Sequence, residues 1–448
     1  MADDMDIRLP EAFAERMKNM LGEEYPDFLK TFQDKNACSG IRINKLKKNA
    51  REAVIKETGE LSGVLWCPDG FYADKNVISG KHPYHIGGLV YFQEPSAMLP
   101  VEALGIREDD FVLDLCASPG GKSTQAAAKL AGSGLLVANE IVPKRASILC
   151  ENIQRMGIKN AIVTNESPDR LADKYRSFFD KIIVDAPCSG EGMFKKEPQA
   201  IWEWSEEHTY SCAERQKNIL RSAFAMLKGG GYLVYSTCTF APCENEEIAA
   251  WVLSEFPEVE LVPIEVTGVS EGKTEWSKSN YDMSVTKRIF PHKARGEGHF
   301  AALFKKNGNE AWEYKKTYKC EKESLFRDFE KEYLNTTLEG TFIDFGDKLF
   351  LMPYNLDIDK IKTELPGLFL GVCKKGRFEP SHALCLALAA EDFKNTTPTE
   401  EPERFFRGET IVGEQKGWTA VLYRGYPIGW GKGSEGMIKN HFPKYLRI

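Results

Sequence analysis

The sequence predicts an α/β fold in which helices cover both faces of a mostly parallel, doubly wound sheet. From about residue 96 to residue 306, short apolar runs alternate with helical stretches, a pattern typical of parallel strands that are buried on both faces. Five successive runs end in a polar or reactive side chain. Because ligands of open α/β sheets bind outside the carboxyl ends of the strands, these ends predict one shared cleft.

The predicted elements of this sheet follow one another regularly. Helical segments are predicted at 123–131, 143–156, 207–228 and 244–255. The strands cover residues 111–116, 134–140, 160–165, 180–188 and 230–238, and a last strand at 299–306 follows a long polar stretch. The polar or reactive groups at the strand ends are Asp114, Glu140, Asn165, Asp185 with Cys188, and Cys238.

Both flanks of this region are less regular. The first part combines amphipathic helices (11–32) with short strands, and the part after residue 310 combines a helix, short strands and a segment at 396–406 that is predicted to be a linker. With 448 residues, several domains are expected. We predict an N-terminal RNA-binding region at 1–95, a catalytic domain at 96–307, an intermediate domain at 308–395 and a small β-rich module at 396–448.

Charge neither excludes nor establishes a nucleic-acid partner. The formal net charge is -7, which disfavours a polyanionic partner. However, residues 41–56, 285–306 and 415–448 each carry six Lys or Arg and one acidic residue. Such stretches are often solvated surface, but three of them in an acidic protein favour a polyanionic partner.

The composition indicates a reduced, globular, cytoplasmic protein. No apolar run approaches the roughly 18 residues of a membrane helix, and the acidic start of the chain does not resemble a signal peptide. The eleven cysteines are scattered and include no C-x-x-C pair, so we expect free thiols and no metal site.

Residues 116–124, "CASPGGKST", resemble a phosphate-binding loop but depart from it at two positions. The loop pattern requires a glycine where Cys116 stands. Pro119 lacks a backbone N–H inside a turn that uses such groups to hold phosphate. An NTPase is therefore disfavoured, and a nucleoside ligand without a phosphate chain fits better.

S-adenosylmethionine is such a ligand. Gly120 and Gly121 allow the backbone to approach a ligand closely. Glu140, at the end of the next predicted strand, can accept both ribose hydroxyls, as acids do in dinucleotide folds. Asn165, at the following strand end, is predicted to meet the adenine.

A second group of residues contains two thiols. "DAPCSGEG" (185–192) and "STCTFAPCENE" (236–246) place Cys188 and Cys238, 50 residues apart, at the ends of what we predict to be neighbouring strands. A single cysteine is usually a core residue. Two thiols beside Asp185, however, suit a reaction in which a thiolate attacks an electron-poor ring carbon and is later eliminated.

Four blocks of the sequence resemble one enzyme family. "LDLCASPGGKSTQAA", "NEIVPKRASILCENIQRMGI", "DKIIVDAPCSGEGMFKKEP" and "LKGGGYLVYSTCTFAPCENEEI" occur in the order and spacing of the Nop/Sun RNA cytosine-5 methyltransferases, over residues 83–306. The "CSGEGMFKKEP" block and the ending "GWGKGSEGMIKNHFPKYLR" most resemble the bacterial RsmF type, which modifies 16S ribosomal RNA and ends in a PUA-like RNA-binding domain. The resemblance implies a class I S-adenosylmethionine-dependent methyltransferase with a Rossmann-like sheet.

The resemblance also implies residue roles. Cys238 would attack carbon 6 of cytosine, Asp185 would hydrogen-bond or protonate ring nitrogen 3, and Cys188 would assist loss of the carbon 5 proton and release of Cys238. DNA cytosine methyltransferases use the Pro-Cys thiol as nucleophile, so the opposite assignment of Cys188 and Cys238 stays open. The residues expected to hold S-adenosylmethionine are Cys116, Ala117, Ser118, Pro119, Gly120, Gly121, Lys122, Glu140, Asn165 and Asp185.

One position departs from the family. Relatives often carry an acid near the end of the third strand, where this chain has Ser167. Asn165 or Glu166 is expected to substitute for it. The implied partner is RNA, either 16S ribosomal RNA or the small ribosomal subunit, with no obligate protein partner and no membrane. The alternatives are the same chemistry on transfer RNA or another RNA, and a non-catalytic RNA-binding assembly factor.

Overall fold

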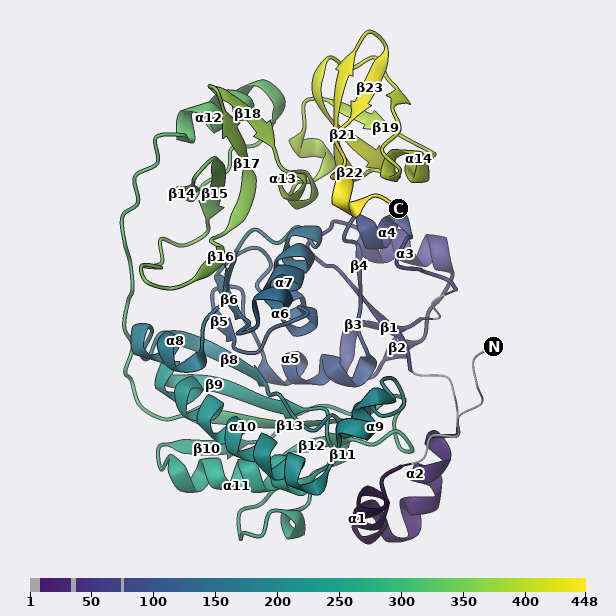
Figure 1. Cartoon of the computed structure of the whole chain (residues 1–448), viewed down its shortest axis with the longest axis vertical. Helices are drawn as coiled ribbons and strands as arrows, with labels where there is room; N and C mark the ends of the chain where they lie inside the picture. Colours follow the sequence, from purple (N-terminus) through teal and green to yellow (C-terminus); the bar gives the residue numbers. More distant parts are fainter. Residues whose placement is uncertain (1–8, 34–37, 74–75) are drawn as a thin grey trace.

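The computed structural model describes residues 9–33, 38–73 and 76–448, which are arranged around a central mixed sheet (Figure 1). Residues 1–8, part of the stretch that argued against a signal peptide, lie outside the described residues. The strands β5, β6, β7, β8 and β9 pair in parallel, and β13 joins β9 antiparallel. The predicted doubly wound α/β fold is therefore confirmed. The spatial order of the sheet is β11 (Ser270–Glu271), β12 (Lys287–Ile289), β13 (His299–Lys306), β9 (Leu227–Thr237), β8 (Phe179–Asp185), β5 (Phe111–Asp114), β6 (Leu135–Asn139), β7 (Ala161–Thr164) and β16 (Thr363–Leu365), and β10 (Val259–Val262) also pairs with β13.

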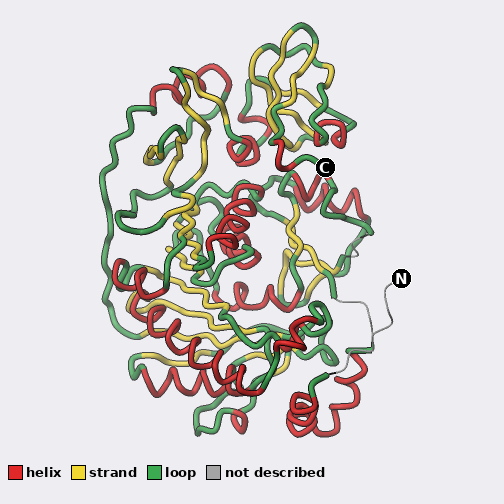
Figure 2. The backbone as a smooth tube through the Cα atoms, viewed as in Figure 1, coloured by secondary structure: helices red, strands yellow, loops and turns green. Residues whose placement is uncertain are grey.

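Helices cover both faces of this sheet, as Figure 2 shows along the whole backbone. On one face α5 (Leu99–Leu104), α6 (Gly121–Lys129) and α7 (Pro143–Arg155) contact one another, and on the other α8 (Pro168–Lys174), α10 (Glu206–Met226) and α11 (Glu246–Glu255) do so. Strand residues such as Leu136, Ile183 and Val234 are completely buried. Burial on both faces explains why these strands are continuous apolar runs.

The N-terminal region forms a second sheet and a separate helical pair. The sheet has the order β2 (Gly63–Val64), β3 (Cys67–Tyr72), β1 (Gly40–Ile43) and β4 (Val90–Phe92), with α3 (Ala50–Thr58) and α4 (Pro83–Ile86) beside it. The helical pair, α1 (Glu11–Leu21) and α2 (Tyr25–Thr31), lies at the bottom of Figure 1, at the opposite end of the molecule from the C-terminal sheet. There Phe13 and Phe28 pack with Phe194 and Phe240 of the catalytic region.

The C-terminal half adds two small sheets above the central one in Figure 1. The first has the order β14 (Thr341–Phe345), β15 (Lys348–Met352), β17 (Leu368–Lys374) and β18 (Arg377–Pro380), with α12 (Glu323–Tyr333) and α13 (His382–Ala387). The second has the order β19 (Thr396–Pro398), β21 (Gly417–Tyr423), β22 (Tyr426–Ser434), β23 (Met437–Asn440) and β20 (Ile411–Val412), with α14 (Pro402–Phe406). The remaining short helices are α9 (Gln199–Glu203) and the 3-10 turns η1 (Gly22–Glu24), η2 (Pro95–Met98), η3 (Glu191–Met193), η4 (Pro242–Glu244), η5 (Thr274–Trp276), η6 (Ala390–Asp392) and η7 (Lys444–Leu446).

The segment at 396–406 is not the predicted linker. Its first part is β19, which pairs in parallel with β21, and its last part is α14. Phe405 and Phe406 are completely buried, so this stretch belongs to the core of the C-terminal sheet despite its Pro, Thr and Glu content. A second departure is β16, which lies beyond the predicted boundary at residue 307 and still joins the central sheet by pairing with β7.

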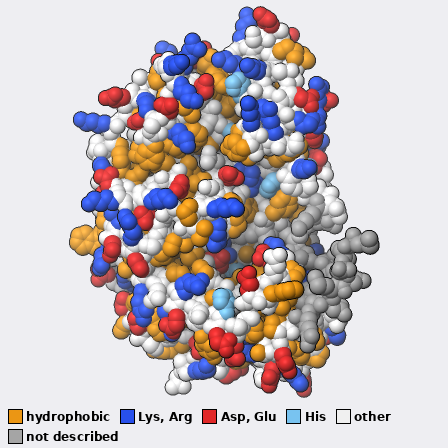
Figure 3. All heavy atoms as spheres, in the orientation of Figure 1, with side chains coloured by type: hydrophobic (Ala, Val, Ile, Leu, Met, Phe, Trp, Pro, Cys, Tyr) orange, Lys and Arg blue, Asp and Glu red, His pale blue; other side chains and the backbone are white. Residues whose placement is uncertain are grey.

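The basic stretches are only partly surface features. Arg42 is 2% exposed and donates hydrogen bonds to the carbonyl of Gly121 (2.8 Å) and to Thr124 Oγ1 (2.7 Å). Arg288 is 1% exposed and forms an ion pair with Glu246. Figure 3 shows the Lys and Arg side chains of one face distributed among Asp and Glu. No helix in the described part of the chain is long and apolar enough to cross a membrane.

Candidate active site at the switch point of the sheet

The strand order of the central sheet reverses between β5 and β8, because β6 and β7 continue to one side and β9 to the other. Such a switch point leaves a crevice at the carboxyl ends of the strands. A cavity of about 600 Å³ lies there. The predicted site residues that line it are Cys116, Ser118, Glu140, Asp185, Cys188 and Cys238. The structure therefore brings residues predicted to bind the nucleoside and the two predicted reactive thiols into one cavity.

The loop after β5 forms one wall of the cavity and is held by neighbouring elements. The N–H of Ala117 donates to the carbonyl of Asn139 (2.8 Å), and Asn152 donates to the carbonyl of Pro119 (2.9 Å). Gly120 has φ +114, and a Cβ atom there would lie 3.2 Å from Leu149. Glycine is therefore needed at this position. Ala117, Pro119, Gly120 and Gly121 shape the wall from behind rather than line the cavity.

Glu140 lies where the ribose-binding acid was predicted. Its side chain is 4% exposed, accepts a hydrogen bond from the N–H of Val142 (2.9 Å) and lies 3.4 Å from Arg145. Ile141 and Val142, which sequence analysis missed, also line the cavity and are 58% and 42% exposed. The sequence pattern that could have identified them is an apolar pair directly after an acidic residue at a strand end. An acid and an apolar pair together suit a nucleoside.

Asn165 does not line the cavity. Its side-chain amide donates to the carbonyls of Glu140 (2.6 Å) and Ile141 (2.9 Å). Both of its N–H donors are thus used to hold the neighbouring loop, and the structure does not support the predicted contact with adenine. Pro168 and Asp169, at the start of α8, line the cavity instead. Glu166 accepts from the N–H of Lys362 (2.8 Å).

Asp185, at the end of β8, is paired with Lys122. Lys122 Nζ lies 2.7 Å from Asp185 Oδ2, and Ser236 Oγ donates to Oδ1 at 2.8 Å. Burial alone would raise the pKa of Asp185, but the Lys122 ammonium and His299 outweigh it and hold this pKa well below its usual range. The carboxyl group is therefore ionised. As a carboxylate, Asp185 is an acceptor only, so its contact with ring nitrogen 3 requires a proton between the two atoms, and its predicted role stays a prediction.

The two thiols lie in contact. Cys188 Sγ and Cys238 Sγ are 3.3 Å apart. The hydrogen bond to Cys238, together with burial, raises the pKa of the Cys188 thiol well above its usual range. A raised pKa favours the protonated form of Cys188, and either sulfur atom can be the donor in the contact between them. Since the thiolate is the reactive form of cysteine, this makes Cys188 the weaker candidate for the nucleophile.

A buried carboxyl group beneath the thiols holds the two cysteine loops together. Glu244 accepts hydrogen bonds from the N–H of Ser189 (3.0 Å) and from Gln216 (2.9 Å), and Ser189 Oγ also contacts Thr239 Oγ1 (2.8 Å). Burial raises the pKa of Glu244 to about 7. Sequence analysis missed Glu244, although it lies in the same "STCTFAPCENE" segment as the Thr-Cys thiol. Among the described residues, no group of three or more potential metal ligands lies together.

Four family models match this chain along most of its length. The description "16S rRNA methyltransferase RsmB/F" matches residues 101–305, and "N-terminal domain of 16S rRNA methyltransferase RsmF" matches residues 9–95. The description "RsmF rRNA methyltransferase first C-terminal domain" matches residues 328–388, and "Methyltransferase RsmF PUA domain" matches residues 394–448.

Similar proteins and structures agree with these matches. Ribosomal RNA small subunit methyltransferase F from Photobacterium profundum is 33% identical, with 98% of this chain and 97% of the relative covered, and the same-named protein from Psychromonas ingrahamii is 30% identical with the same coverage. A methyltransferase homolog protein from Pyrococcus horikoshii aligns with a TM-score of 0.60 at 28% identity, covering 67% of this chain and 96% of that one. NSun6 from the same organism, solved with SFG, shares the fold at a TM-score of 0.58 and 22% identity, covering 67% of this chain and 99% of that one.

Proposed function

Because this chain belongs to the RsmF family of S-adenosylmethionine-dependent ribosomal RNA methyltransferases, we propose that it methylates carbon 5 of cytosine in 16S ribosomal RNA through a covalent adduct with Cys238. The observation that carries this proposal is the contact of two thiols, 3.3 Å apart, in the cavity that also holds Asp185 and Glu140. A methyltransferase acting on oxygen or nitrogen has no use for this pair.

The cavity has the chemistry that S-adenosylmethionine requires. Its volume of about 600 Å³ lies in the usual range for ligand sites. Glu140 is available for the ribose hydroxyls, Ile141 and Val142 offer apolar surface for the adenine, and the 116–121 loop lies beside them. The bound cofactor would supply an electrophilic methyl group. Catalysis beyond this step belongs to residues of the chain.

Cys238, as thiolate, would form a bond to carbon 6 of cytosine. Electron density would then move toward carbon 5 and nitrogen 3. The Asp185 carboxylate would accept a hydrogen bond from the 4-amino group with one oxygen. A proton from the Lys122 ammonium, 2.7 Å behind it, would reach nitrogen 3 through the other oxygen. Charge that develops on the ring is thereby stabilised by groups already in position.

After carbon 5 has received the methyl group, the adduct must be resolved. Carbon 5 loses its proton to Cys188, while the proton that Cys188 carried passes to Cys238 Sγ as the bond between carbon 6 and sulfur breaks. Nitrogen 3 returns its proton to Lys122 as the product forms. Cys188 ends the cycle as a thiol, and Cys238 ends as a thiol that loses one proton to solvent before the next turnover, which is the proton released by the overall reaction. The 3.3 Å contact between the two sulfur atoms permits this transfer without a bridging water.

The target base must leave its stack to reach this cavity, at a cost of a few kcal/mol unless it is already unpaired. We propose that the N-terminal region (1–95) and the C-terminal module (396–448) bind the flanking RNA and offset this cost through exposed basic residues such as Lys45 and Arg51. A location in the cytoplasm, where the ribosome is assembled, follows from the same substrate assignment.

The deciding experiment measures which atom and which RNA receive the methyl group. Tritiated S-adenosylmethionine would be incubated with small-subunit RNA, with assembled small subunits and with transfer RNA, and the products digested to nucleosides. We expect label in 5-methylcytidine from 16S RNA. Label in transfer RNA alone would keep the chemistry and overturn the substrate, and label on another atom of the base would overturn the chemistry. No label in any RNA would favour a non-catalytic assembly factor.

A further inference from the structure

A histidine lies behind Asp185, in a position that the proposed reaction does not yet use. His299 is the first residue of β13, and its neighbour Phe300 pairs with Thr237 of β9. This register brings the imidazole next to the carboxyl end of β8, with His299 Nε2 3.6 Å from Asp185 Oδ1. The Nε2 atom is buried and has no hydrogen-bond partner within the described residues.

His299 reaches the cavity only through Asp185. The side chains of His299 and Lys122 are 3% and 9% exposed, whereas that of Asp185 is 32% exposed and lines the cavity. A base in the cavity would therefore meet the carboxylate, with Lys122 and His299 supporting it from behind. His299 can influence the reaction by holding Asp185, but it does not line the cavity.

The surroundings of His299 determine which form of the ring is present. The charged groups that act on it are Asp185, Lys122 and Glu94, and Glu94 already accepts the N–H of Glu297 at 3.0 Å. Burial, followed by the Lys122 ammonium, lowers the pKa of His299, so the imidazole is neutral. Because a nitrogen lone pair facing a carboxylate would be repelled, the Nε2 atom carries the ring proton and points it at Oδ1.

We propose that His299 is a positioning residue for recognition of the cytosine 4-amino group: its Nε2–H and the Ser236 hydroxyl hold Asp185 Oδ1 from behind, so that the carboxylate keeps one orientation toward the base. At 3.6 Å, Nε2 lies within ion-pair distance of Oδ1 and a few tenths of an ångström beyond a hydrogen bond, so the imidazole limits how far the carboxylate can turn away from the base. This inference rests on the proposed function, since it assumes that cytosine is the base that Asp185 meets.

Two substitutions separate this role from simple space filling. His299→Leu keeps a side chain of similar volume without a donor, whereas His299→Gln places an amide N–H the same number of bonds from the backbone. For single-turnover transfer at saturating S-adenosylmethionine, we expect His299→Leu to be slower by about 10- to 100-fold, the effect of one lost hydrogen bond to a charged group. We expect His299→Gln to remain within about 3-fold of the wild type, by the same reasoning.

A second substrate tests the specific role. The target nucleotide is first identified with the wild type. An RNA is then made that carries 2-pyrimidinone, a base that lacks the 4-amino group, at this nucleotide. The rate of covalent adduct formation is then compared between the wild type and His299→Leu. We expect the difference between the two proteins to shrink to less than about 3-fold on this RNA, because no amino group remains for Asp185 to bind.

The outcomes distinguish this inference from the proposed function. If the wild type transfers no methyl group to carbon 5, the proposed function has failed. If the wild type does so and His299→Leu reacts at the wild-type rate, only the role of His299 is overturned. Equal slowing of His299→Leu and His299→Gln, or equal slowing of His299→Leu on cytosine and on 2-pyrimidinone, would also overturn it, since both results indicate a packing role. Thermal unfolding of both variants checks that each is folded during the assays.

Discussion

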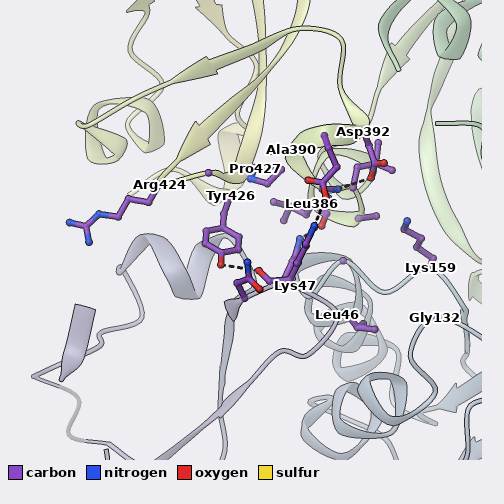
Figure 4. A pocket seen from close by; sticks show the side chains of 18 of the residues that line it. Leu46, Lys47, Gly132, Lys159, Leu386, Ala390, Asp392, Arg424, Tyr426 and Pro427 are labelled. Atoms are coloured by element: carbon purple, nitrogen blue, oxygen red, sulfur yellow. Dashed lines mark hydrogen bonds and ion pairs between the residues drawn. The ribbon is translucent and has the colours of Figure 1, made fainter. Parts of the chain in front are cut away.

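Two cavities of similar volume differ in what their polar groups are free to do. The catalytic cavity measures about 600 Å³ and the cavity at the junction of the N-terminal, central and C-terminal regions about 630 Å³. In the junction cavity several polar groups are already used. Lys47 donates to the carbonyl of Leu386 (Figure 4). Tyr426 donates to the carbonyl of Lys48 (3.0 Å), and Lys48 Nζ lies 3.4 Å from Glu391.

In the catalytic cavity the reactive groups also reach the open space. Asp185 is paired with Lys122, yet its side chain is 32% exposed and lines the cavity, and Cys238 lines it beside the Cys188 thiol, whose pKa is raised. Cavity size therefore does not identify the reactive site of this protein. The availability of polar and nucleophilic groups does, and the predictions below test that distinction, beginning with the largest expected effect.

Removing the proposed nucleophile should abolish methyl transfer in the catalytic cavity. Cys238→Ala is expected to reduce methyl transfer by about 1000-fold or more, because no other group can form the bond to carbon 6. The measurement is incorporation of tritium from labelled S-adenosylmethionine into RNA. Cys243→Ala is the matched control, since Cys243 lies in the same segment but contacts Thr209 (3.4 Å) outside this cavity. Full activity of Cys238→Ala would reassign the nucleophile.

Removing the second thiol should stop the reaction at a later stage. In Cys188→Ala the bond from Cys238 to carbon 6 still forms, but the transfer of protons that releases it is lost, so we expect turnover to slow by about 100-fold. A protein–RNA adduct that survives denaturing electrophoresis is the readout. The double variant with Cys238→Ala should show no adduct. An adduct that appears only in Cys238→Ala would exchange the roles of the two cysteines.

Removing Lys122, the partner of Asp185, should change the pH dependence of methyl transfer. In the wild type the pKa of Asp185 lies well below its usual range, so the carboxylate stays ionised between pH 5 and 8. In Lys122→Met burial raises this pKa, and we expect transfer to fall by about 100-fold and to fall further as the pH is lowered. Rates measured from pH 5.5 to 8.5 at saturating substrates test this. A profile parallel to that of the wild type would contradict the assigned role of the ion pair.

A change at the junction cavity should leave the chemistry intact. Lys47→Met keeps the apolar part of the side chain but removes the donor to the carbonyl of Leu386. We expect kcat and the KM for S-adenosylmethionine to stay within about 2-fold of the wild type. The unfolding temperature should fall by a few degrees, because a buried carbonyl left without a donor lowers the free energy of unfolding by about 1–3 kcal/mol. A loss of transfer with unchanged stability would show that the junction takes part in the reaction.

Much of the site could be predicted from short stretches of sequence. The strand-end positions of Asp185, Glu140 and Cys238 follow from apolar runs that end in polar residues, and the predicted family and cofactor are confirmed by the family models and relatives. Asn165 was misread, because a strand-end amide looks the same whether it faces a ligand or the carbonyls of its neighbours. The segment at 396–406 was misread because its composition suggests a turn, whereas β19 gains its partner from β21 further along the chain.

The sequence by itself determined which reactive residues are present and which strand ends carry them, because periodicity and turn residues act over a few neighbouring positions. Only the tertiary structure decided which of those residues meet. Lys122 and Asp185 are 63 positions apart, and the two thiols are 50 apart. His299 reaches Asp185 through an antiparallel strand whose register no local pattern specifies. Side-chain partners depend on the order of strands in the sheet, and that order follows from burial of the whole core.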